Sequence, residues 1–100
     1  MRATTIPDSA GAEALAIRAL AFIAADATLL PRFLALTGIE AKDVRAAASE
    51  PGFLAGVLQF ILAHEPTLMQ FAADAGIDPA DIARACRALP FGDDVQERAS

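Results

Sequence analysis

The chain has 100 residues, of which 55% are apolar, and a formal net charge of -5. This length and apolar content predict one globular domain and exclude a disordered chain. The acidic charge argues against nonspecific binding to nucleic acid or to an anionic membrane, because both need clustered Lys and Arg. Cys86 has no second cysteine to pair with, and no apolar run approaches the ~20 residues of a membrane span. We therefore expect a cytoplasmic protein that does not enter a membrane.

The elements predicted along the chain are all helical. Prolines stand at the ends of apolar runs, and no stretch alternates apolar and polar residues with the period of a strand. We expect helices at about 9–25, 28–37, 41–48, 51–63, 66–75 and 79–89, in a single domain of residues 9–90. Residues 1–8 and the polar residues 91–100 are expected to be flexible ends.

One motif occurs twice in the chain, 38 residues apart. Residues 20–47 align with residues 58–85 without a gap, and eleven of the 28 aligned positions are identical. The identities are core, turn and cap residues, so the repeat specifies architecture. We predict a compact all-α bundle built from two three-helix repeats, at about 13–48 and 51–89. As repeat equivalents, the first and fourth helices should pack against each other near a pseudo-two-fold axis.

Helix ends carry recognisable signals in both repeats. Gly38 and Gly76 should end the middle helices in the left-handed conformation that glycine adopts easily. An acidic residue followed by proline should start three helices, as an N-cap and its first helical position. These pairs are Glu50 with Pro51, Glu65 with Pro66, and Asp78 with Pro79.

The first and fourth helices are apolar on nearly all sides, which is typical of central helices. Their surplus apolar surface is a candidate interface for another protein or for a second copy of the chain. The candidate interaction residues are Leu15, Phe22, Phe53, Val57 and Phe60.

Residues that could support catalysis are few. His64 is the only histidine, and we place it in the last turn of the fourth helix, where the helix dipole explains it. Cys86 lies between two arginines, but its spacing from Ile82 and Leu89 predicts a buried thiol.

Acidic residues recur in pairs at equivalent helix starts, where capping explains them. The pairs are Glu40 with Asp43 and Asp78 with Asp81. No phosphate-binding loop, nucleophile elbow or metal motif is present. We expect no enzyme activity, no metal and no cofactor.

A helix–turn–helix pattern offers an alternative function. The glycine corners have suitable spacing, and the last helix would present Arg84 and Arg87 to DNA. Asp81 lies near the end that would enter the groove, which disfavours this alternative.

Three positions differ in character between the repeats, and a functional site would be sought among them. They pair His64 with Asp26, Arg32 with Gln70, and Leu36 with Asp74.

Several phrases of the chain, including RFLALTGI, FLAGVLQFILAHE and DAGIDP, resemble a small alphaproteobacterial family catalogued as domain of unknown function 3572. The likeness covers residues 13–90. It implies a short helical protein of the bacterial cytosol, and it implies no activity, cofactor or catalytic residue. The favoured function from the sequence is a non-enzymatic module that binds a protein partner or itself.

Overall fold

The computed structural model describes residues 9–50 and 52–90, and in this part of the chain all regular structure is helical. Six α-helices occur: α1 (Ser9–Ala24), α2 (Leu29–Thr37), α3 (Val44–Ala47), α4 (Phe53–Leu62), α5 (Glu65–Ala75) and α6 (Pro79–Ala88). A short 3-10 helix, η1 (Ala41–Asp43), leads into α3. The predicted all-α bundle is confirmed. The flexible ends expected at 1–8 and 91–100, and the cap expected at Pro51, fall outside the described residues.

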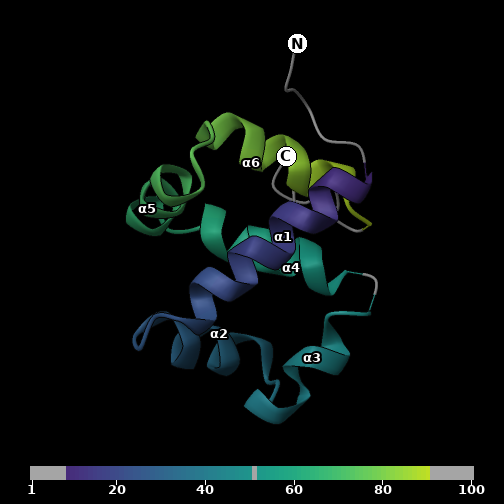
Figure 1. The fold of residues 1–100 in the computed structure, drawn as a ribbon. Helices are drawn as coiled ribbons and strands as arrows, with labels where there is room; N and C mark the ends of the chain where they lie inside the picture. The colour runs from purple at the N-terminus through teal and green to yellow at the C-terminus, as the bar shows by residue number, and fades with distance from the viewer. Residues whose placement is uncertain (1–8, 51, 91–100) are drawn as a thin grey trace.

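The two long apolar helices form the centre of the bundle. Figure 1 shows α1 crossing α4, with α5 and α6 on one side and α2 and α3 on the other. Helix α6 packs closely on both α1 and α4, and α5 contacts α4 and α6. The predicted packing of the first helix against the fourth is therefore confirmed.

The buried face of α1 consists mainly of alanine. Ala12, Ala16 and Ala19 are fully buried and continue in register to Ile23, so one narrow stripe faces the core. Small side chains allow the neighbouring helices to approach this stripe. Apart from Ile23, the larger fully buried side chains come from the other helices, and full burial of each aliphatic one stabilises the fold by about 1.5–3 kcal/mol. They include Val57, Leu58, Ile61 and Ile82.

Both predicted glycine corners are confirmed. Gly38 has a φ of 74° and Gly76 a φ of 72°, and each ends its helix in the left-handed region. The Gly38 N–H donates to the Leu34 carbonyl at 2.9 Å, and the Gly76 N–H donates to the Ala72 carbonyl at 2.8 Å. A Cβ atom at either glycine would meet nothing within 4 Å, so the requirement for glycine is one of backbone conformation.

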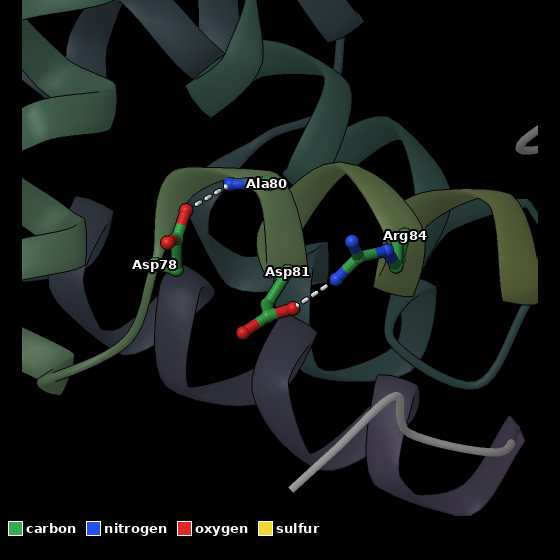
Figure 2. Close-up of polar contacts among 4 residues, drawn as sticks. All are labelled: Asp78, Ala80, Asp81 and Arg84. Atoms are coloured by element: carbon green, nitrogen blue, oxygen red, sulfur yellow. Dashed lines mark hydrogen bonds and ion pairs between the residues drawn. The ribbon is translucent and has the colours of Figure 1, made fainter.

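Of the two predicted acid–proline starts that lie within the described residues, one has the expected geometry. The Asp78 carboxylate accepts the Ala80 N–H at 2.9 Å, and Pro79 is the first residue of α6 (Figure 2). For α5 the prediction was wrong, because the N-cap is His64 and Glu65 is the first helical residue. Helix α4 begins at Phe53, later than predicted, because Gly52 has a φ of 89° that no right-handed helix contains.

The third helices of the two repeats differ. The helix expected at 41–48 is instead a 3-10 turn followed by the four residues of α3, none of them buried. The expectation that Glu40 caps this segment was wrong, because its side chain makes no capping hydrogen bond and lies 3.8 Å from Lys42 Nζ. Asp43 also makes no side-chain cap.

Candidate interaction groove

The predicted interaction residues do not form an exposed apolar face. They are Leu15, Phe22, Phe53, Val57 and Phe60. Val57 has no exposed surface, so its expected exposure was wrong. The other four are half-buried against the core. The three phenylalanines form intramolecular ring pairs, Phe22 with Phe71 at 5.3 Å, Phe53 with Phe33 at 5.8 Å, and Phe60 with Phe33 at 5.3 Å. These rings therefore contribute to the fold first.

An apolar groove of about 710 Å³ lies between α1 and the η1–α3 segment. Its α1 and α2 side is formed by Ile17, Leu20, Ala21, Ala24 and Leu30. The opposite side carries Val44 and Ala48, together with the cations Lys42 and Arg45. Ile17 is 53% exposed, although it lies at the middle of a long apolar helix.

A second hollow, of about 360 Å³, continues this groove. The two hollows share Ile17 and Ala48, and the second one extends toward Leu54 and Leu89. Its charged lining residues are Glu13 and Glu50. The continuous groove is therefore basic at the end lined by Lys42 and Arg45 and acidic at the end lined by Glu13 and Glu50.

In the second repeat the equivalent positions are buried, and one of them, Ala55, also lines the second hollow. Thirty-eight residues after Ile17 and Ala48 lie Ala55 and Cys86, which are 1% and 3% exposed. The Cys86 thiol donates to the Ala55 carbonyl at 3.7 Å, so α4 and α6 are in direct contact there. In the first repeat the equivalent residues stand on a groove that is open to solvent.

His64 lies in a different place from the one predicted. Helix α4 ends at Leu62, and His64 is the exposed N-cap residue of α5, with its Nδ1 atom 2.8 Å from the buried Thr67 Oγ1. Its repeat equivalent, Asp26, accepts the backbone N–H groups of Thr28 and Leu29 at 2.8 and 3.0 Å. Asp26 therefore bonds to the backbone of the turn that leads into α2, and His64 makes no such bond to the start of α5. The N-cap residues themselves, Thr28 and His64, make no side-chain cap.

The asymmetric positions identified in the sequence meet in space. Arg32, Leu36 and His64 all line one small hollow of about 110 Å³, together with Phe60 and Thr67. Leu36 is 72% exposed at its edge. The hollow is large enough for a few atoms only, so it is a minor feature beside the groove on α1.

Comparison with known proteins identifies the family. A family model described as protein of unknown function (DUF3572) matches residues 9–92. The chain belongs to this family. No curated protein and no solved structure matches the chain. The DUF3572 match spans both repeats and therefore includes every residue of the groove.

Residues considered for chemistry in this DUF3572 domain are dispersed. Among residues 9–50 and 52–90, no three His, Cys, Asp or Glu side chains gather in a way that could hold a metal ion. Cys86 is buried, as predicted, on the same face of α6 as Ile82 and Leu89. Asp78 caps α6, and Asp81 forms an ion pair with Arg84 (Figure 2).

The two arginines proposed for DNA contact are both exposed on α6. Arg84 is engaged with Asp81, and the N-terminus of the helix also carries Asp78 (Figure 2). A phosphate approaching this end of α6 would meet two carboxylates, which disfavours binding. Arg87 lies in the last turn, where it faces the negative end of the helix dipole.

No single helix in the described part of the chain is both long and apolar enough to cross a membrane. Helices α1 and α2 meet that standard only as a pair, and they are bent by 116° at the break between them.

The sequence did not predict the groove residues, because the largest apolar side chains were expected to form the interaction surface. A signal was present in the repeat alignment. Lys42 and Arg45 stand where the second repeat has Ala80 and Ala83. Ala83 is half-buried on α6, so a long cation at the equivalent position 45 indicates a less closed surface there.

Proposed function

We propose that the chain is a non-enzymatic interaction module whose groove between α1 and α3 holds a segment of a protein partner. The observation that carries the proposal is the exposure of Ile17 at the centre of an open apolar groove. Contiguous exposed apolar surface of this kind is typical of interaction sites. The repeat supports it, because Ile17 is 53% exposed whereas the equivalent Ala55 is 1% exposed.

The chemistry of the candidate catalytic residues supports a non-enzymatic role. Buried thiols behave as small apolar groups, and Cys86 is 3% exposed. Asp78 and Asp81 are occupied by a cap and an ion pair. We also propose a cytoplasmic location, which is supported by a lone cysteine in place of a disulfide.

Site-specific photo-crosslinking in the native cell tests the interaction. We would replace Ile17 with benzoylphenylalanine and use Met69 as the matched control, because it is 51% exposed on α5 and lies outside the groove. The proposal predicts a discrete adduct from Ile17 and none from Met69. No adduct from Ile17, or the same products from both sites, would refute it.

A further inference from the structure

We infer that the groove binds an amphipathic helix of a different protein, with acidic residues facing Lys42 and Arg45 and basic residues facing Glu13 and Glu50. The inference rests on the proposed function and deepens it by specifying the chemistry of the partner.

The shape of the groove fits a helix. One wall is α1 and the other is the η1–α3 segment, and the groove follows α1 from Glu13 to Ala24, a length of about 16 Å. A partner helix of about three turns spans that length, and its apolar residues at helical spacing would lie on Ile17. The described residues contain no strand, so they offer no sheet edge for an extended peptide.

The charges at the basic end are available to a partner. Lys42 Nζ lies 3.8 Å from Glu40 Oε1, and both side chains are more than two-thirds exposed, so this pair is weak and screened. Arg45 is exposed and forms no ion pair with the described residues. An acidic side chain on the partner could therefore form ion pairs with Lys42 and Arg45 beside the apolar surface of the groove.

The charges at the opposite end have the opposite sign. Glu13 and Glu50 are exposed and form no ion pair within residues 9–50 and 52–90. A groove that is basic at one end and acidic at the other favours one orientation of its ligand, because the reversed ligand would place like charges together. The partner helix must therefore carry both signs, separated along its length.

A second copy of the chain does not supply such a helix from its described residues. The most amphipathic candidate, α6, has its apolar residues Ile82, Ala85 and Cys86 buried in its own core. Its exposed side carries Arg84 and Arg87 in place of apolar residues. Two grooves related by a two-fold axis would match in charge, but each would remain unfilled. A helix from another protein satisfies both the shape and the charge of the groove.

The test combines the Ile17 crosslink with reversal of the groove charges in the full chain. We would compare Lys42→Glu with Arg45→Glu, Glu13→Lys with Glu50→Lys, and a control pair, Arg84→Glu with Arg87→Glu. Each groove pair should lower adduct yield by about tenfold, since two ion pairs of modest strength are reversed. The control pair should leave the yield unchanged. All six positions are at the surface, and circular dichroism would verify that each variant is folded.

Sequencing the crosslinked peptide supplies the decisive readout. The inference predicts a segment of another protein with apolar residues at helical spacing and opposite charges at its two ends. A synthetic peptide of that sequence should bind the purified chain, and a peptide with its acids changed to lysine should prefer the Lys42→Glu, Arg45→Glu variant. An adduct to a second copy, or to residues 91–100 of the same chain, would overturn the inference. So would an adduct insensitive to charge reversal, although the proposed interaction would then stand. No adduct at Ile17 would overturn both.

Discussion

Helix α6 buries one face of a ten-residue helix against α4 and α1, whereas α3, its counterpart in the first repeat, has four residues and buries none. Each segment follows a glycine corner, Gly38 or Gly76, at the same distance in the sequence. One closes its half of the bundle, and the other leaves a groove beside α1.

The difference has local causes that can be read from the residues. Helix α6 begins with the Asp78 cap and Pro79, which fix its first turn. The equivalent residues are Glu40, which makes no side-chain cap, and Ala41, and a 3-10 turn forms there. Poor initiation keeps α3 short, so it has too few apolar residues to hold itself on the core.

The identity of the apolar residues adds to this effect. Ile82 and Cys86 of α6 are matched in the first repeat by Val44 and Ala48, which are smaller and only half-buried. Less apolar area is gained by closing α3 onto α1. The comparison teaches that the repeat fixes the scaffold, while divergence within it leaves open the apolar groove that we assign to binding.

The largest expected effect is the difference in stability between equivalent substitutions in α6 and α3, the third helices of the two repeats. Ile82→Ala should lower the free energy of unfolding by about 3 kcal/mol, because Ile82 has no exposed surface. Val44→Ala should cost less than about 1 kcal/mol, because Val44 lines the open groove. Urea denaturation followed by circular dichroism measures both, and equal losses would mean that α3 is packed as tightly as α6.

Substitution of either corner glycine should lower the stability by a similar amount, because the corner is a feature that both repeats share. Gly38→Ala and Gly76→Ala should each cost on the order of 1 kcal/mol, because both glycines have positive φ and neither Cβ atom would clash. Thermal melts of the two variants measure this cost. An unchanged melt for either variant would show that its corner is not constrained as described.

The smallest expected effect concerns the missing cap. His64→Asp should raise the free energy of unfolding by about 0.5–1 kcal/mol at neutral pH, because the carboxylate can cap α5 as Asp26 caps the turn before α2. The control is Asp26→Ala, which removes the existing cap and should destabilise by a similar amount. A destabilised His64→Asp variant would show that the contact with Thr67 stabilises more than a cap does.

Much of the fold was predictable from the sequence. Helices α1, α2, α5 and α6 lie within one residue of their expected bounds, because proline, glycine and acidic caps act locally. The burial of Cys86 followed from its spacing with Ile82 and Leu89 on one helical face.

The groove could not be predicted in the same way, because it depends on packing between distant segments. The alanine stripe of α1 faces the core. Ile17 therefore lies outside the core, although Ile17 is more apolar than Ala16. The phenylalanines predicted as interface residues instead form ring contacts within the bundle, as Phe22 does with Phe71. Helix periodicity identifies an apolar face, but tertiary contacts decide which of two such faces is buried.

Thiol labelling at Ala48 and Cys86 tests most directly whether one repeat is open where the other is closed. We would compare the native chain with an Ala48→Cys, Cys86→Ala variant, so that each protein has one thiol at equivalent positions. The account predicts that maleimide labels Cys86 at least about a hundredfold more slowly than a free thiol, because the buried thiol reacts only after local opening. The Ala48→Cys thiol should react within about tenfold of the free rate, because it lines the groove. Equal protection at the two positions would contradict the open groove.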